Sequence, residues 1–476
     1  MDTKRTMKYV LISCGFLLFV GCASPLKERK ENKTVPTSFN NSQDTVNTAK
    51  MKWKEFFTDP YLEVLIDTAL KNNQEYNITL QEIIIAQNEI RARKGEYLPF
   101  VGLGAAGGVD KVGEYTRNGA VEKNLNIKDG TKFPDPLTDM MFGANASWEV
   151  DIWKKLRNAK KSAVLRYLGT VEGRNFMVTN IISEIATSYY ELMAFDNQLE
   201  ILRQNIEIQQ NALEIVKMEK QAAKVTELAV RRFEAEVLKN QSRQYHILQQ
   251  IVETENRINF LIGRYPQPVQ RNSQGFQSLV PAKVQTGVPS QLLQNRPDIR
   301  QAELQLAAAR LDIKVARANF YPSLRITAGV GYNAFNAKYL VTSPQSLMYT
   351  LAGELVAPLV NRNAIKAYYY SATAKQIQAA YNYERTILNA YVEVANQVAN
   401  INNLEQSYNL RTQQVQALTQ SIEISTRLFR SARADYMEVL LTQRDAVEAK
   451  FELVETKMEQ MHAMVSVYRA LGGGWK

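Results

Sequence analysis

The stretch AQNEIRARKGEYLP at residues 86–99 recurs as ARLDIKVARANFYP at residues 309–322, 223 residues later. Each copy has the pattern of a helix that runs into a proline and is followed by a strand-like segment. Upstream, NQEYN at 73–77 and RPDIR at 296–300 keep the same separation and carry an acidic residue where a helix begins. A repeat of this length indicates one structural unit used twice, so we divide the chain into a first repeat at 59–288 and a second at 289–476.

The segment SLRITAGVGY at 323–332 alternates apolar residues with polar or very small ones, which is the length and period of a transmembrane strand. The alternation recurs at 140–150 and 347–355, and more weakly at 101–105. Four strands are therefore predicted, two per repeat. Their lipid-facing residues are expected to be Leu324, Ile326, Ala328, Val330 and Tyr332, with Ala144, Ala146, Trp148, Val150, Leu347, Tyr349, Leu351, Leu355, Val101, Leu103 and Ala105 in the other three. Glu149 then faces a water-filled lumen.

Long helices are predicted at 154–225 and 363–434, because neither segment contains a proline and each carries an apolar heptad seam. A return of about 40 residues follows each one, as in a coiled-coil hairpin. The seam residues are Leu199, Leu202, Ile206, Leu213 and Val216 in the first repeat, and Ile401, Leu404, Tyr408, Val415, Leu418 and Ile422 in the second, with Val447, Phe451, Val454, Met458, Met461, Val465 and Tyr468 on the return. About 65 helical residues span roughly 100 Å, so these helices are expected to project far beyond the size of a globular domain.

No apolar stretch after residue 22 is long enough for a spanning helix, so any membrane crossing is expected to be made by strands. One chain offers four strands, whereas closed bacterial barrels need at least about eight. Three copies supply about twelve, and two would supply a barrel that its own side chains usually fill. The predicted fold is therefore an internally duplicated α+β membrane protein, with a trimeric 12-stranded β-barrel and a long α-helical coiled-coil tunnel.

The N-terminus has the pattern of a lipoprotein export signal at residues 1–21, with a basic start and an apolar core at 10–20. The core ends in FVGC, which resembles a lipobox and predicts lipidation at Cys22. Cys14 fits the pattern locally, but cleavage there leaves too short an apolar core. Residues 22–58 are then a lipidated tether. Because Ala23 rather than Asp follows the cysteine, the expected location is the outer membrane, with the helical part in the periplasm.

Other classes of function find little support in the residues. The net charge of +10 is scattered, without the block of basic residues typical of nucleic-acid binding. His246 and His462 both lie in helical sequence, and one mature cysteine offers neither a disulfide nor a metal pair. We therefore predict no catalytic site, no metal, no cofactor and no nucleic-acid partner.

The segment LLQNRPDIRQAE at 292–303, with the alanines that follow it and Pro322, closely resembles the outer membrane factor family of TolC-like and NodT-type efflux lipoproteins. The segment WEVDIW at 148–153 resembles that family's strand-to-helix junction, and the resemblance covers nearly the whole mature chain. We assign a structural role to the motif residues Arg296, Pro297, Asp298, Arg300 and Glu303.

This resemblance implies a homotrimer that acts as a passive exit duct, with no enzymatic activity, in a tripartite efflux system. The implied partners are a periplasmic adaptor, an inner-membrane RND-type pump and the lipid of the outer membrane. Two alternatives remain open: the same duct in a type I protein secretion system, and a non-conducting coiled-coil scaffold of the envelope.

The resemblance also implies that the far ends of the helical hairpins form a gate and contact the adaptor. The residues expected there are Val225, Thr226, Glu227, Phe429, Arg433, Asp435 and Glu438. Ala223 and Ala432 stand where the family has glycine, and Ala229 where it has an acidic residue.

Overall fold

The structure is a computed structural model, and it describes residues 27–39, 45–283, 285–431 and 433–475. The predicted lipidation site Cys22 and the tip residue Ala432 lie outside the described residues. Two compact units make up the chain. The sheet unit contains 85–167 and 304–381, and the hairpin unit contains 31–84, 168–303 and 382–476. Both sequence repeats contribute to each unit.

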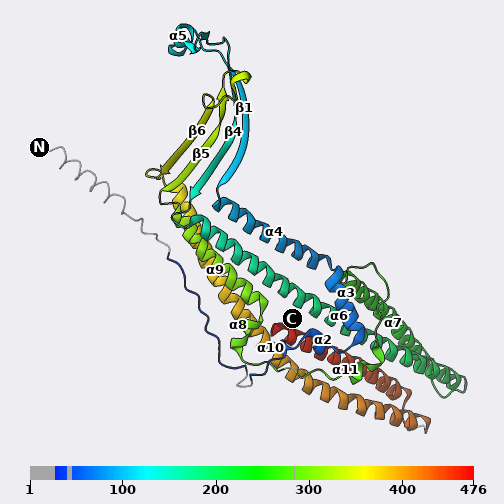
Figure 1. Cartoon of the computed structure of the whole chain (residues 1–476). Helices are drawn as coiled ribbons and strands as arrows, with labels where there is room; N and C mark the ends of the chain where they lie inside the picture. The colour runs from blue at the N-terminus through cyan, green and yellow to red at the C-terminus, as the bar shows by residue number, and fades with distance from the viewer. Residues whose placement is uncertain (1–26, 40–44, 284, 432, 476) are drawn as a thin grey trace. The chain divides into compact units, whose positions relative to one another are not determined.

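The sheet unit holds one antiparallel sheet in the order β1-β4-β5-β6 (Figure 1). Its strands are β1 (Phe100–Asp110), β4 (Leu137–Val150), β5 (Ser323–Ala334) and β6 (Leu347–Val356). All four predicted strands are thus confirmed. The loop between β1 and β4 is the longer of the two hairpin loops, and it contains α5 (Arg117–Asn124) and the short pair β2 (Asn126–Lys128) and β3 (Thr131–Lys132). These three elements were not predicted, because the segment is polar and lacks periodicity.

The helices occur in equivalent positions in the two repeats, as the sequence indicates. Those that lead into the strands are α4 (Gln74–Tyr97) and α9 (Pro297–Ala318), and those that leave them are α6 (Lys155–Gln221) and α10 (Asn363–Arg430). The returning helices are α7 (Glu227–Leu261) and α11 (Tyr436–Ala470). Both outward helices end four residues before the predicted 225 and 434, because the backbone turns there. Shorter elements are η1 (Thr48–Lys50), α2 (Trp53–Phe56), α3 (Pro60–Asn72), η2 (Ser273–Ser278), η3 (Pro289–Gln291), α8 (Leu292–Asn295) and η4 (Ala337–Tyr339).

The hairpin unit is built on one large apolar core from α3, α6, α7 and α11. The first-repeat seam is buried as predicted, and most of the α11 seam is buried with it. The α10 seam is half-buried. Part of the predicted tether also belongs to this core, since Trp53, Phe56 and Phe57 are buried in it. The Phe56 ring stacks on Tyr468 with ring centroids 4.0 Å apart.

Each returning helix ends in the same joint, made with the helix that starts its repeat. After α7, Gly263 has φ +71°, and after α11, Gly472 has φ +87°. The amide Nδ2 of Asn73 donates to the carbonyl of Leu261 at 2.8 Å, and Nη1 of Arg296 donates to the carbonyl of Ala470 at 2.7 Å. These bonds satisfy carbonyls that a helix end leaves without partners. The joint therefore occurs once in each repeat, between equivalent elements.

Candidate functional site

The sheet has one apolar face. Cross-strand partners point to the same side of a sheet, so the register decides which residues share a face. Trp148 pairs with Ile326, Val150 with Leu324, and Leu324 with Leu355. The same registers place every residue predicted to face lipid on this side. The face is exposed, with Leu103 at 89% and Leu351 at 78% of full accessibility.

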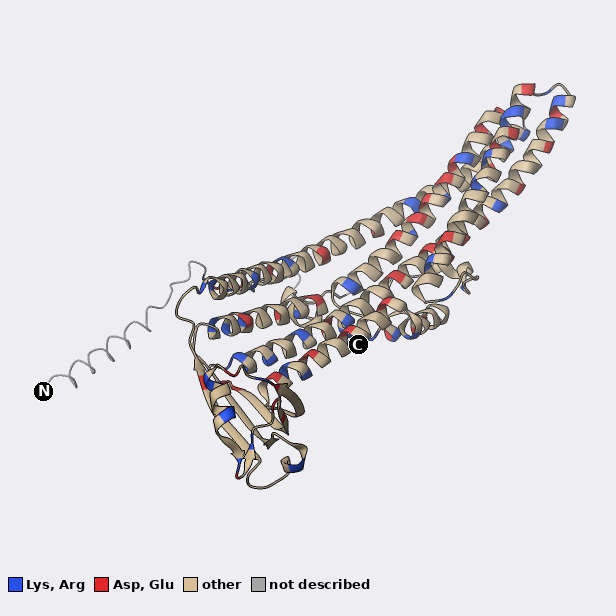
Figure 2. Ribbon diagram, turned by 90° about the horizontal axis from the view of Figure 1, so that it is seen from above, with Lys and Arg blue, Asp and Glu red and all other residues tan. Residues whose placement is uncertain are grey.

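The opposite face carries mostly small and polar residues. In successive rows Gly143 pairs with Gly331, Asn145 with Gly329, and Ser147 with Thr327. Charges are rare on the strands, whereas the long helices mix acidic and basic residues along their whole length (Figure 2). A sheet with one exposed apolar face and one polar face has the pattern of a wall between lipid and water.

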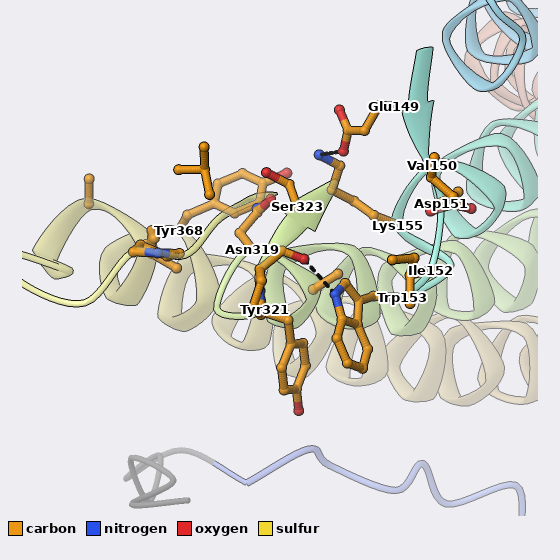
Figure 3. A pocket seen from close by; sticks show the side chains of 16 residues that line it. Glu149, Val150, Asp151, Ile152, Trp153, Lys155, Asn319, Tyr321, Ser323 and Tyr368 are labelled. Atoms are coloured by element: carbon orange, nitrogen blue, oxygen red, sulfur yellow. Dashed lines mark hydrogen bonds and ion pairs between the residues drawn. The ribbon is translucent and has the colours of Figure 1, made fainter. Parts of the chain in front are cut away.

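A cavity of about 420 Å³ lies where the sheet meets the helices, lined by residues of β4, α9, β5 and α10 (Figure 3). Glu149 and Lys155 form an ion pair at its rim. The indole of Trp153 donates to the carbonyl of Pro322 at 2.7 Å and stacks on Tyr321 at 4.7 Å. Trp153 and Tyr321 are partly exposed, as aromatic residues at a membrane interface are.

The first hairpin tip is a tight turn between α6 and α7. The amide of Lys224 donates to the carbonyl of Glu219 at 2.9 Å, which is a Schellman-type bond, and Ala223 adopts φ +52°. Glu227 begins α7 and pairs with Lys220 and Arg231. The hydrogen bond from Lys220 and the charges of both cations lower the pKa of Glu227.

The predicted residues Val225 and Thr226 flank that turn. Thr226 occupies the N-cap position of α7 but makes no side-chain capping bond, and Val225 packs against a small core beneath the tip. Ala229 is fully buried in this core, next to Val230 and Phe233. A carboxylate could not lie there without a large desolvation cost, which gives a physical reason for alanine at this position.

The second tip repeats the turn, since the amide of Arg433 donates to the carbonyl of Leu428 at 2.9 Å. Phe429 is half-buried in the last turn of α10. Asp435 is the N-cap residue of α11 without a side-chain bond, and Glu438 lies in its first turn. Among the described residues, no ion pair within 4.0 Å joins the exposed side chains of Arg433, Asp435 or Glu438 to another group of this chain.

The motif residue Arg296 is buried and connects three elements. Its guanidinium binds Asp298 at 2.7 Å and Glu393 of α10 at 2.8 Å, besides the carbonyl of Ala470. Burial alone lowers the pKa of Arg296, but the bonds and charges of Asp298 and Glu393 outweigh it and raise that pKa. Arg469 also binds Glu393, at 2.9 Å. The cluster fixes the start of α9 against α10 and the end of α11.

The other motif residues extend this arrangement. Pro297 is the first residue of α9, where its missing N–H costs nothing. Arg300 pairs with Glu172 of α6 at 2.8 Å, and Glu303 pairs with Lys33 at 2.6 Å. Sequence reasoning found these residues but missed Glu393 and Glu172, because neither stands in a recognisable motif.

The two histidines lie apart. His246 is exposed, whereas the Nε2 of His462 lies 3.1 Å from the carbonyl of Thr187. In the described part of the chain, no three His, Cys, Asp or Glu residues are grouped so as to hold a metal ion. No described helix is long and apolar enough to cross a membrane.

Comparison with known proteins agrees with this geometry. The model of the outer membrane efflux protein family matches residues 65–264 and 288–473. The chain is 28% identical over 426 residues to the pyoverdine export outer membrane protein OpmQ of Pseudomonas aeruginosa, covering 89% of this chain and 88% of that protein. It is 26% identical to the cation efflux system protein CusC of Escherichia coli, covering 97% of this chain and 98% of that protein.

Solved structures share the fold. The open state of the MtrE outer membrane channel of Neisseria gonorrhoeae superposes with a TM-score of 0.83 at 22% identity, covering 95% of this chain and 99% of that one. A CusC structure superposes with a TM-score of 0.81 at 24% identity, covering 95% and 100%. The repeated hairpins, the two-faced sheet and these matches together assign this chain to the outer membrane efflux protein family.

Proposed function

We propose that this chain is the outer-membrane channel component of a tripartite efflux system, a passive duct through which small molecules leave the cell. The observation that carries the proposal is the sheet, whose two faces differ in polarity along every strand. An exposed apolar face costs free energy in water but none in lipid. The small residues of the other face leave room for a water-filled path.

The free edges of the sheet support assembly into a trimer. In the described chain, β1 and β6 pair on one side only, and an open edge cannot lie in lipid because its backbone groups lack partners. Pairing β1 of one copy with β6 of the next is a head-to-tail contact that closes into a ring. Three copies give a closed sheet of about twelve strands with space inside.

The helices support the same assembly. Leu238, Tyr245 and Val252 form an exposed apolar stripe on α7, at 59%, 74% and 49% of full accessibility. Their repeat equivalents on α11 are Val447, Val454 and Met461, which are buried against the rest of the hairpin unit. The same helix face is buried in the second repeat and exposed in the first. This fits a ring in which the next copy covers the exposed face of α7.

A lipid anchor at Cys22 also belongs to the proposal. The described segment that follows it lies along α10. The backbone of Arg29 exchanges two hydrogen bonds with the side chain of Gln376, at 3.0 and 2.8 Å. Further along, the ring of Phe39 stacks on Tyr391 at 5.3 Å. These contacts favour an anchor whose tether is held against the long helix.

We place the helical part in the periplasm and assign the contact with a periplasmic adaptor, and through it an inner-membrane pump, to the two tips. Arg433, Asp435 and Glu438 support this, because exposed charges without an ion-pair partner among the described residues of their own chain are available to another protein or to other copies. The cargo is a small molecule by analogy. OpmQ exports pyoverdine and CusC is a cation efflux protein, as their names state.

The test has two parts. Purified protein should run as a heat-modifiable trimer in detergent and should give discrete conductance steps in a planar lipid bilayer. Deleting the gene should raise the accumulation of dyes, drugs or metal ions, and the wild-type gene should restore their export.

Three results count against the proposal. A monomer that passes no current would indicate a scaffold rather than a duct. Unchanged accumulation together with lost export of a particular protein would indicate a secretion duct. A Cys22→Ser protein that still incorporates radiolabelled palmitate would refute the anchor alone.

A further inference from the structure

One row of charges crosses the polar face of the sheet. Glu149 of β4 pairs in register with Arg325 of β5, and Arg325 pairs with Glu354 of β6. Register partners share a face, so the three side chains project from the same side as Asn145 and Ser147. The row lies at the end of the sheet where the strands join the helices.

The rest of this face contrasts with the row. Between the row and the opposite end of the sheet, the paired positions hold glycine, alanine, serine, threonine, asparagine, phenylalanine and methionine. Charge returns at Asp139, which accepts a hydrogen bond from Asn333 at 2.7 Å. Arg325 is thus the one cation on the paired positions of this face among the described residues.

The members of the row differ in how they are bound. Glu149 is tied to Lys155 at the rim of the cavity, and both side chains are only about a quarter exposed (Figure 3). Arg325 and Glu354 are exposed. Among the described residues, neither side chain forms an ion pair within 4.0 Å. Their charges are therefore free to act on a passing solute.

We infer that Arg325 and Glu354 set the charge selectivity of the duct where the sheet meets the helices. The inference rests on the proposed function, since the polar face must line the permeation path. Three copies form a belt of three cations and three anions, with the Glu149–Lys155 pairs beside it. Rings of charged side chains select ions in other channels by the same electrostatics.

The size of the effect follows from the geometry. Twelve strands about 4.8 Å apart enclose a lumen with a radius of roughly 10 Å, so each belt charge acts on an ion about 10 Å away. Three unit charges at that distance, screened by 0.1 M salt, change the partition of a monovalent ion about twofold. The ratio of potassium to chloride permeability changes by more, because the two ions respond in opposite directions.

The experiment measures that ratio from the reversal potential of the full-length channel in a bilayer under a potassium chloride gradient. Arg325→Gln should raise the ratio at least about twofold, and Glu354→Gln should lower it by a similar factor. Each belt variant is also made in a background that carries Asp435→Asn and Glu438→Gln. In that background the charges at the tips cannot hide the effect of the belt on the permeability ratio. Heat-modifiable trimers verify assembly of each variant.

The charge-swapped variant Arg325→Glu, Glu354→Arg is the matched control. It keeps the charge of the belt and should retain the wild-type ratio. If conducting single variants keep the wild-type ratio, or if the swap shifts it as far as Arg325→Gln does, the inference is wrong. A wild-type trimer that passes no current overturns the channel function itself, which is a different result.

Discussion

Replacing Gly472 with alanine is expected to destabilise the hairpin unit strongly. Gly472 has φ +87°, and a Cβ added there would lie 2.6 Å from the carbonyl oxygen of Asn295. The left-handed conformation costs an alanine roughly 1–2 kcal/mol. The contact is with backbone rather than with a flexible side chain, so relief requires the end of α11 to move away from the start of α9. We expect a total loss of about 2–4 kcal/mol.

The repeat provides an internal comparison. At Gly263 the φ is +71°, and an added Cβ would lie 2.5 Å from the carbonyl oxygen of Asn72. Gly263→Ala should therefore be about as costly as Gly472→Ala. Gly275→Ala is the matched control, because its φ is not positive and its nearest neighbour, the Oγ of Ser278, would be 3.9 Å away.

The assay is thermal unfolding of the detergent-solubilised protein, followed by near-UV circular dichroism at one fixed scan rate. Gly472→Ala and Gly263→Ala should each lower the apparent Tm by at least about 4 °C, and Gly275→Ala should change it by less than about 1 °C. If Gly472→Ala unfolds at the same apparent Tm as Gly275→Ala, the joint is not the rigid contact that its geometry indicates.

Three further changes test other parts of the chain. Ala223→Gly removes a left-handed alanine and should stabilise the first tip by about 1 kcal/mol, seen as slower amide hydrogen exchange at 219–227; unchanged exchange would show that the turn is not strained. Arg296→Ala leaves Asp298 without its cation and Glu393 with Arg469 alone, so it should cost about 3–5 kcal/mol, and Arg296→Lys less; equal Tm values for both would contradict this. Burial, aided by the charge of Arg257 and opposed by Glu191 and the bond to Thr187, lowers the pKa of His462. Folding therefore favours the neutral ring, so stability should be full above about pH 6.5 and fall toward pH 5. His462→Gln should flatten that slope, and an unchanged slope would mean that other groups cause it.

Sequence periodicity was sufficient for the parts of this fold that repeat. Alternation with period two located all four strands and sorted their faces, because one side of each strand is apolar over most of its length. The spacing of 223 between NQEYN and RPDIR likewise located the starts of α4 and α9. These patterns are local, and the sequence displays them in full.

Contacts between distant segments could not be predicted in this way. Arg296 was singled out, but its partner Glu393 lies 97 residues away in the middle of a long helix. Nothing around Glu393 distinguishes it from the other acidic residues of α10. The charged row of the sheet was predicted only in part, since Glu149 was expected in the lumen but Arg325 and Glu354 were not singled out. Its alignment with Arg325 depends on the register between strands of different repeats, and the alignment of Arg325 with Glu354 depends on the register within the second hairpin.

The turns at the two tips bear on where the proposed gate would rearrange. Lys224 and Arg433 make the same bond to the residue five positions earlier, which is the bond of a Schellman-type turn. In the first tip an alanine occupies the left-handed position, and its strain lowers the stability of the turn relative to glycine. The small core around Phe233 and Leu440 is separate from the large core of the hairpin unit. Elements that move are drawn from the least stable parts of a structure. A strained turn above a small, separate core is thus the part of the first hairpin that we expect to rearrange at the lowest cost, which agrees with the proposal that the tips form the gate.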